Sequence, residues 1–178
     1  QHRATHLFPA STLPAMASAA TPAIKSLQAA GISYEIRQFR HDPRATSFGD
    51  EAVTELAAEG FVAAQIFKTL VLAIPGGLAV AVLPVPDKLS FKAAAAALGV
   101  PRAEMAEQAA AQRATGYVVG GISPLGQRKS LPTVVDESAL GWDRVLCSAG
   151  KRGLDIVLAP ADLVTATSAV TAEICTPR

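Results

Sequence analysis

The sequence has few of the residues on which several functional classes depend. Of its 178 residues, two are cysteine and 5% are aromatic. Two cysteines without C-x-x-C or Cys/His ligand spacing are too few for a disulfide framework and do not indicate a zinc site. They agree with a reducing, cytoplasmic compartment. The balance of 16 Lys and Arg against 15 Asp and Glu excludes a strongly polybasic binder, so any contact with nucleic acid has to be local.

Long hydrophobic runs are also absent, although 50% of the residues are hydrophobic. Pro75-Gly76-Gly77, Pro84 and Pro86 interrupt the apolar segments, so none approaches the roughly 20 residues that span a bilayer. Residues 1–15 contain no Met and do not resemble a signal peptide. We expect a leader or an added tail over 1–20, with Met16 as the natural start. A single domain over 21–170 and a C-terminal tail over 171–178 complete the expected organisation.

Helix and strand patterns alternate along this domain. Capping residues and hydrophobic spacing predict helices over 22–30, 48–59, 91–98, 106–115 and from 160 onward. Alternating or continuous apolar runs predict strands over 32–39, 67–74, 78–82, 117–119, 133–135, 144–148 and 154–158. Turns such as 150–153 are too short for parallel crossovers. The expected fold class is therefore α/β (α+β), with a mixed, largely antiparallel sheet that curls toward a barrel and is flanked by helices.

The most informative segment is glycine-rich: residues 115–127 read TGYVVGGISPLGQ. Glycines leave backbone N–H groups uncovered, so such a loop can wrap an anion or a carbonyl oxygen. The segment lacks the terminal Lys-Ser/Thr of a P-loop and the third glycine of a dinucleotide-binding motif. By composition alone, a tight turn between strands is the favoured explanation.

Four motifs in order give the chain a family resemblance. They are FKTL at 67–70, TGYVVGGISPLG at 115–126, LPT at 131–133 and SAGKRGL at 148–154. Together they resemble the YbaK/EbsC family of aminoacyl-tRNA deacylases, a branch of the prolyl-tRNA synthetase editing-domain superfamily. The resemblance covers about residues 21–164. It implies the YbaK/aminoacyl-tRNA synthetase-associated domain fold and the removal of cysteine from mischarged Cys-tRNA(Pro).

Lys68 matches the lysine of the family's F/Y-K-T motif, which implies a catalytic role. A single ammonium can hold the ester carbonyl or the terminal phosphate of the tRNA without carrying a proton. The alternative is a solvated lysine at a strand edge. Lys68 interrupts an otherwise apolar run from 66 to 74, where burying a charge costs free energy unless something binds it, and this favours function.

The resemblance also implies a set of substrate-binding residues: Phe39, Thr69, Gly120, Gly121, Ile122, Ser123, Pro124, Ser148 and Asp155. The glycine-rich part would grip the terminal adenosine and the aminoacyl group. Ser148 is equally explained as a turn residue, and Asp155 as a solvent-facing strand residue. Phe39 stands where relatives have a tyrosine, so any role of that hydroxyl is lost.

Other groups are weaker candidates for the chemistry. Cys147 lies in an apolar strand, and His41 is the only histidine in the expected domain, so a buried core cysteine is favoured over a nucleophile. His2 and His6 have i, i+4 spacing but no third ligand, and we expect neither a metal nor another cofactor. The resemblance implies instead that the cysteine thiol of the substrate attacks its own ester carbonyl.

Two alternatives remain open at the level of sequence. One is deacylation of another small amino acid, as in Ala-tRNA(Pro), because a small pocket discriminates weakly by size. The other is a non-catalytic tRNA-binding module with a basic rim at 127–129 and 151–152. The expected partners are the 3′ end of mischarged tRNA(Pro) and prolyl-tRNA synthetase, with no role for a membrane or DNA.

Overall fold

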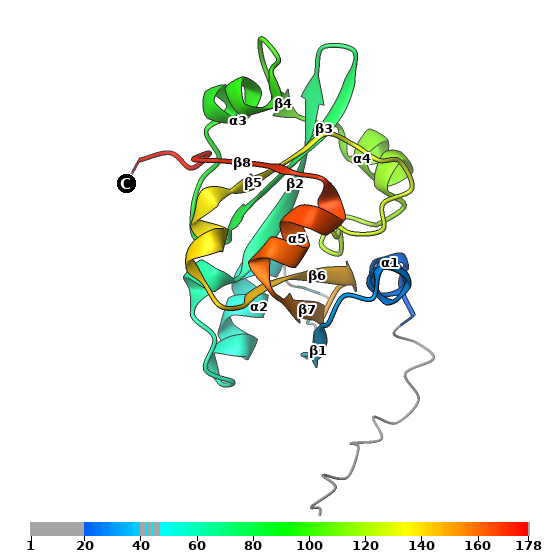
Figure 1. Cartoon of the computed structure of the whole chain (residues 1–178), viewed down its shortest axis with the longest axis vertical. Helices are drawn as coiled ribbons and strands as arrows, with labels where there is room; N and C mark the ends of the chain where they lie inside the picture. Colours follow the sequence, from blue (N-terminus) through cyan, green and yellow to red (C-terminus); the bar gives the residue numbers. More distant parts are fainter. Residues whose placement is uncertain (1–19, 40–41, 43, 45–46, 178) are drawn as a thin grey trace, which may run out of the picture.

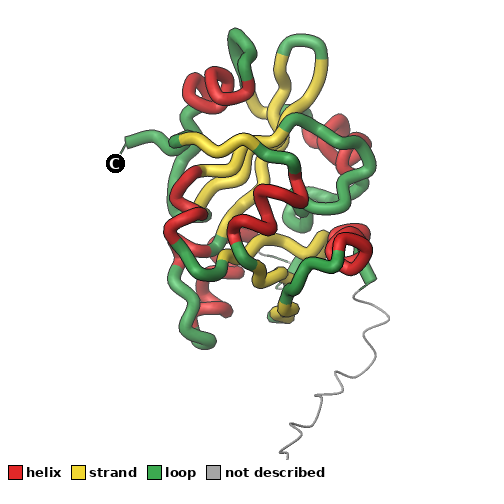
Figure 2. Tube along the Cα trace, viewed as in Figure 1, coloured by secondary structure: helices red, strands yellow, loops and turns green. Residues whose placement is uncertain are grey.

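The helices of the domain cover its two sheets from several sides (Figures 1 and 2). The computed structural model describes residues 20–39, 42, 44 and 47–177. The helices are α1 (Pro22–Ala30), α2 (Phe48–Ala57), α3 (Phe91–Leu98), α4 (Gln108–Thr115) and α5 (Pro160–Thr167), with short 3-10 helices η2 (Ala63–Gln65) and η3 (Glu137–Gly141). The strands are β1 (Glu35–Gln38), β2 (Phe67–Ile74), β3 (Gly77–Pro84), β4 (Glu104–Met105), β5 (Thr133–Asp136), β6 (Val145–Lys151), β7 (Leu154–Leu158) and β8 (Val170–Ala172).

The strands form a five-stranded and a three-stranded sheet. The larger sheet has the order β4-β2-β3-β5-β8, and the smaller one has the order β1-β7-β6. Pairing is parallel between β3 and β5 and between β5 and β8, and antiparallel in the other pairs. The predicted mixed, largely antiparallel arrangement is therefore confirmed. The expected curling into a barrel is not observed, because the described strands remain in two sheets with no closed barrel.

Local signals explain most of the elements. Thr21 caps α1 by accepting a hydrogen bond from the Ile24 amide at 3.2 Å, and the helix ends at Gly31 in the left-handed conformation. Ser90 caps α3 in the same way through the Ala93 amide at 3.1 Å. The β2–β3 hairpin turns at Gly76, which has a φ of +83°.

Three parts of the chain differ from the sequence-based prediction. Residues 117–118 form a loop and residue 119 begins a turn, rather than a strand. Tyr117 is buried, and its hydroxyl donates to the carbonyl of Leu125 at 2.6 Å, which folds the segment back. The short strands β4 and β8 were not predicted. The expected tail after residue 170 instead begins in β8 and packs on the fold, with Ile174 fully buried. The expected leader over 1–20 lies outside the described residues except for residue 20.

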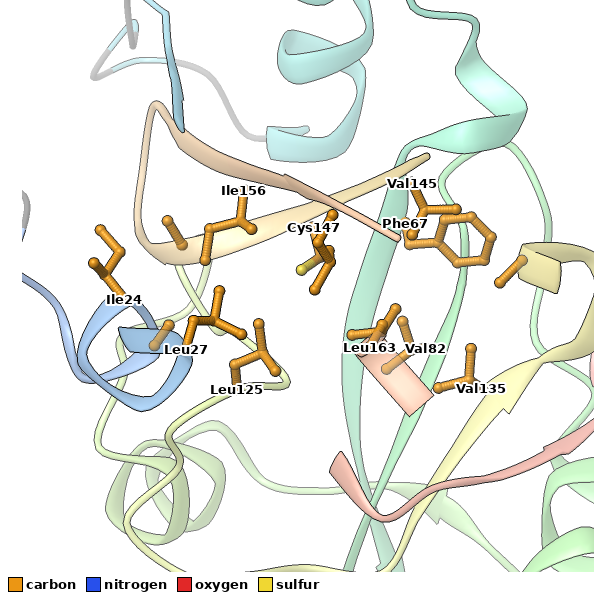
Figure 3. Close-up of a cluster of buried hydrophobic side chains, with 14 of the residues drawn as sticks. Ile24, Leu27, Phe67, Val82, Leu125, Val135, Val145, Cys147, Ile156 and Leu163 are labelled. Carbon is orange, nitrogen blue, oxygen red and sulfur yellow. The ribbon is translucent and has the colours of Figure 1, made fainter. Parts of the chain in front are cut away.

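The main core lies between the two sheets and is closed by α1 and α5. Figure 3 shows Leu27, Cys147, Ile156 and Leu163 pointing into this cluster. Each of these four side chains is fully buried. This packing fixes the β6–β7 hairpin against β2, which positions the pocket described below. In the part of the chain that the structure describes, no helix is long and apolar enough to cross a membrane.

Candidate active site

A cavity of about 390 Å³ opens between α2, β2, the glycine-rich loop and the β6–β7 hairpin. Seven residues predicted to form the site line it: Phe39, Lys68, Thr69, Gly120, Ile122, Ser148 and Asp155. Their positions extend from residue 39 to residue 155, so the fold gathers distant motifs around one cavity. The three remaining predicted residues, Gly121, Ser123 and Pro124, are buried and do not line the cavity.

Lys68 projects from β2 and is half-buried. Its Nζ donates hydrogen bonds to the carbonyl oxygens of Val85, at 3.1 Å, and Asp87, at 2.5 Å. Burial lowers the pKa of Lys68, whereas the carboxylate of Asp87 acts in the opposite direction. The ammonium is therefore held in place by the protein and is not a freely solvated surface group.

Thr69 follows Lys68 on the same strand and also lines the cavity. Its Oγ1 is buried and has no hydrogen-bond partner among the described residues. An unpartnered buried hydroxyl costs about 1–3 kcal/mol. At the cavity wall, this hydroxyl is open to a hydrogen bond with a bound molecule.

The glycine-rich loop is fixed by its own hydrogen bonds. The Val119 amide donates to Gln112 Oε1 at 3.0 Å, and the Gly121 amide donates to the Val118 carbonyl at 2.9 Å. Within the described residues, the amides of Gly120 and Ile122 have no partner. Both residues line the cavity.

Gly120 packs against a stacked pair at the cavity wall. The guanidinium of Arg152 lies 4.2 Å from the centroid of the Phe48 ring and donates two hydrogen bonds to the Val119 carbonyl, at 2.9 and 3.2 Å. A Cβ atom on Gly120 would lie 2.7 Å from Arg152 Nε and 2.7 Å from Phe48 Cδ2. A side chain at this position would therefore force the stacked pair to shift.

Ser148 and Asp155 are paired across the β6–β7 hairpin. Ser148 Oγ accepts a hydrogen bond from the Gly150 amide at 3.1 Å, so this residue both forms the turn and lines the cavity. Asp155 is 7% exposed, which contradicts the solvent-facing alternative. Burial raises the pKa of Asp155 to about 7, so its carboxyl group is largely protonated at slightly acidic pH.

Phe39 extends the β1–β7 pairing through its amide, which donates to the Gly153 carbonyl at 2.9 Å. Its ring packs against the small cluster that contains Ala52 and Leu56 and also lines the cavity. The ring therefore contributes apolar surface and no hydroxyl group to the cavity wall. Phe48 and the carbonyls of Val85 and Asp87 were missed by sequence reasoning, since no motif marks them.

Cys147, judged a weaker candidate from sequence, does not line the cavity. Cys147 is fully buried in the main core, and burial raises the pKa of its thiol. His2, His6 and His41 lie outside the described residues. Over residues 20–39, 42, 44 and 47–177, no cluster of three or more His, Cys, Asp or Glu residues has a metal-binding arrangement.

These features define a mixed α+β domain with a concave cavity lined by Lys68, Thr69 and residues of the glycine-rich loop. The model of the aminoacyl-tRNA editing domain family matches residues 49–166. EbsC of Enterococcus faecalis, provisionally named a Cys-tRNA(Pro)/Cys-tRNA(Cys) deacylase, is 39% identical over 130 residues, which cover 71% of this chain and 79% of EbsC. The chain belongs to the aminoacyl-tRNA editing domain family.

Two further similarities agree with this family. A proline–tRNA ligase of Shouchella clausii is 33% identical over 142 residues, which cover 80% of this chain and 24% of the ligase. A crystal structure described as a provisional trans-editing enzyme for prolyl-tRNA synthetase matches with a TM-score of 0.77 and 24% identity, over 89% of this chain and 98% of that one. At this identity the second match supports the fold.

Proposed function

We propose that this protein removes cysteine from mischarged Cys-tRNA(Pro) in trans, as an aminoacyl-tRNA deacylase. The observation that carries the proposal is the cavity itself, in which the Lys68 ammonium, the unpartnered Thr69 hydroxyl and two amides of the glycine-rich loop gather. The similarity to EbsC supports cysteine as the amino acid, and leaves Cys-tRNA(Cys) as a second substrate.

Each group has a proposed role on the ester. Lys68 holds the ester carbonyl or the terminal phosphate through its remaining N–H, while the Gly120 and Ile122 amides donate to the oxygen on which negative charge develops. Thr69 gains a partner when the substrate binds. Asp155, whose pKa is about 7, does not place a full negative charge beside this oxygen while it is protonated.

The proposed reaction uses the substrate as its own nucleophile. The cysteine sulfur forms a bond to the ester carbonyl carbon, the ester C–O bond breaks, and the thiol proton passes to the released ribose hydroxyl. The products are a cyclic thiolactone and free tRNA. One observation supports this route: Cys147 is fully buried in the main core and does not line the cavity. The protein then contributes orientation and charge stabilisation.

Deacylation of three substrates side by side tests the activity. We expect Cys-tRNA(Pro) to be deacylated faster than Ala-tRNA(Pro), with Cys-tRNA(Cys) also accepted. Faster turnover of Ala-tRNA(Pro) would assign the protein to alanine removal, and binding without turnover of any of them would leave a tRNA-binding module. Added prolyl-tRNA synthetase should favour Cys-tRNA(Pro) over Cys-tRNA(Cys) if the synthetase supplies the tRNA.

Modified substrates test the mechanism. Because the thiol is the proposed nucleophile, Ser-tRNA(Pro) should react far more slowly and S-alkylated Cys-tRNA(Pro) hardly at all. Normal cleavage of the alkylated substrate would indicate attack by water and make the enzyme a hydrolase.

A further inference from the structure

Asp155 is a buried acidic residue on the face of β7 that borders the cavity. Successive side chains of a strand point to opposite faces of the sheet. Figure 3 shows Cys147 and Ile156, which are paired across the β6–β7 hairpin, pointing into the main core. The next pair, Ser148 and Asp155, therefore lies on the other face, and both residues line the cavity. Asp155 is 7% exposed, so its carboxyl group meets the cavity and little bulk solvent.

The cation nearest to Asp155 in the strand register is engaged elsewhere. Arg37 stands opposite Asp155 in the β1–β7 pairing. Its guanidinium forms ion pairs with Glu35 at 2.9 Å and with Glu59 at 3.1 Å. Within the described part of the chain, no hydrogen bond or ion pair reaches the Asp155 carboxyl group.

The cations of the cavity wall do not supply a counter-charge for Asp155 either. Lys68 and Arg152 both donate to backbone carbonyls. Lys151 is exposed and forms no ion pair with a described residue. Burying a carboxylate costs free energy unless a cation or a hydrogen-bond donor compensates it. A positively charged ligand group in the cavity would therefore stabilise the ionised form of Asp155.

The substrate of the proposed reaction carries such a group next to its ester. The α-amino group of an aminoacyl ester can hold a proton at neutral pH, and it is attached to the carbon beside the reacting carbonyl. We propose that the Asp155 carboxylate binds the α-ammonium group of the aminoacyl-tRNA, so that the protein acts on residues with a free amino group and rejects N-acylated ones. This inference rests on the proposed function. The ion pair has no net charge, so it does not oppose negative charge on the ester oxygen.

A contact between Asp155 and a ribose hydroxyl is the alternative, because a carboxylate also accepts hydrogen bonds from neutral groups. The two contacts differ in their dependence on the amino group of the substrate. N-acetyl-Cys-tRNA(Pro) lacks the ammonium but keeps the ribose, the ester and the thiol. It therefore separates recognition of the amino group from recognition of the ribose.

Single-turnover deacylation of Cys-tRNA(Pro) and N-acetyl-Cys-tRNA(Pro) tests the inference, with each rate divided by the uncatalysed rate of the same substrate. We expect the wild-type protein to prefer the free amino group by about 10- to 100-fold. Asp155→Asn should lose most of this preference, because a neutral amide oxygen attracts an ammonium less strongly than a carboxylate does. Asp143→Asn, which changes an exposed acidic residue between η3 and β6, should keep the preference.

Two results would overturn the inference. One is a wild-type protein that acts on both tRNAs with equal normalised rates. The other is a preference for the free amino group that survives in Asp155→Asn, which would assign this recognition to another group. Equal losses on both tRNAs in Asp155→Asn would indicate the ribose contact.

A binding measurement decides if Asp155→Asn does not fold. The probe is an unreactive amide analogue, 3′-amino-3′-deoxyadenosine acylated with S-methylcysteine. Its binding to the wild-type protein should lower the pKa of Asp155 by about one unit or more in a ¹³C-carboxyl NMR titration, and acetylation of its amino group should abolish this change. An unchanged pKa with the free-amino analogue would refute the ion pair. Failure of the proposed function is distinguishable, because a protein that deacylates neither tRNA would still report the ion pair in this titration.

Discussion

Replacement of Gly120 by alanine tests whether the glycine-rich loop works through close packing. Gly120 has a φ of +88°, and its new Cβ would lie 2.7 Å from both Arg152 Nε and Phe48 Cδ2. Two effects therefore lower the free energy of unfolding. The left-handed backbone conformation costs about 1 kcal/mol for alanine, and the overpacking costs about 1–3 kcal/mol. The stacked pair has to separate to make room.

Gly76→Ala is the matched control. Gly76 has a φ of +83°, but nothing lies within 4 Å of the position of its Cβ. The Gly76→Ala variant therefore carries only the cost of the left-handed backbone conformation and no cost of overpacking. We expect Gly120→Ala to lower the free energy of unfolding by about 2 kcal/mol more than Gly76→Ala does. For a chain of this size, this difference corresponds to a melting temperature lower by roughly 4–8 °C.

Thermal melting and deacylation of both variants check this reasoning. Gly120→Ala should also lower kcat/KM by about 10- to 100-fold, because the two free amides and the cavity wall move together. Gly76→Ala, in a hairpin turn outside the cavity, should keep the wild-type rate. Equal melting temperatures and equal rates for the two variants would refute the argument, since they would mean that Arg152 and Phe48 relax without cost.

Three other changes separate stability from activity. Burial raises the pKa of Asp155 to about 7, so the folded chain retains a proton that the unfolded chain releases, and stability falls as pH rises from about 4 to about 7. Asp155→Asn should remove this fall, on the order of 3 kcal/mol between pH 5 and pH 8, in urea titrations at these two pH values; an unchanged pH dependence would assign it to other groups. Thr69→Val should keep or raise stability, because the unpartnered hydroxyl disappears, yet slow deacylation; an unaffected rate would exclude Thr69 from substrate binding. Cys147→Ala should cost about 1–2 kcal/mol in the core and leave the rate unchanged, whereas an inactive folded variant would identify a protein nucleophile.

The fold could be predicted where its signals are local. α1 and α3 begin at side-chain caps, Thr21 and Ser90, and the β2–β3 hairpin turns at Gly76, so a few adjacent residues specify each. β8 could not be found in this way, because Val170–Ala172 is short and becomes a strand only by parallel pairing with the distant β5. Residues 117–119 look like a strand, but contacts with residues outside the segment override that local pattern.

The site residues also fall into two groups, those that a sequence motif marks and those that only the tertiary fold brings to the cavity. Lys68 and the glycine-rich loop lie in motifs that the sequence displays directly, and both reach the cavity. Phe48 and Asp87 carry no such signal, since an aromatic residue at a helix start and an acidic residue in a turn are common. Their relevance depends on the tertiary fold, which brings α2 and the β3–α3 connection against β2 and the loop.

The central claim is that Lys68 holds the reacting end of an aminoacyl-tRNA. Single-turnover deacylation of Cys-tRNA(Pro) by wild-type protein, Lys68→Ala and the control Lys92→Ala tests it most directly; Lys92 is an exposed lysine on α3. We predict that Lys68→Ala loses about 10²- to 10³-fold in rate while retaining its circular dichroism spectrum, and that Lys92→Ala reacts like wild type. A folded Lys68→Ala protein with the wild-type rate would contradict the account.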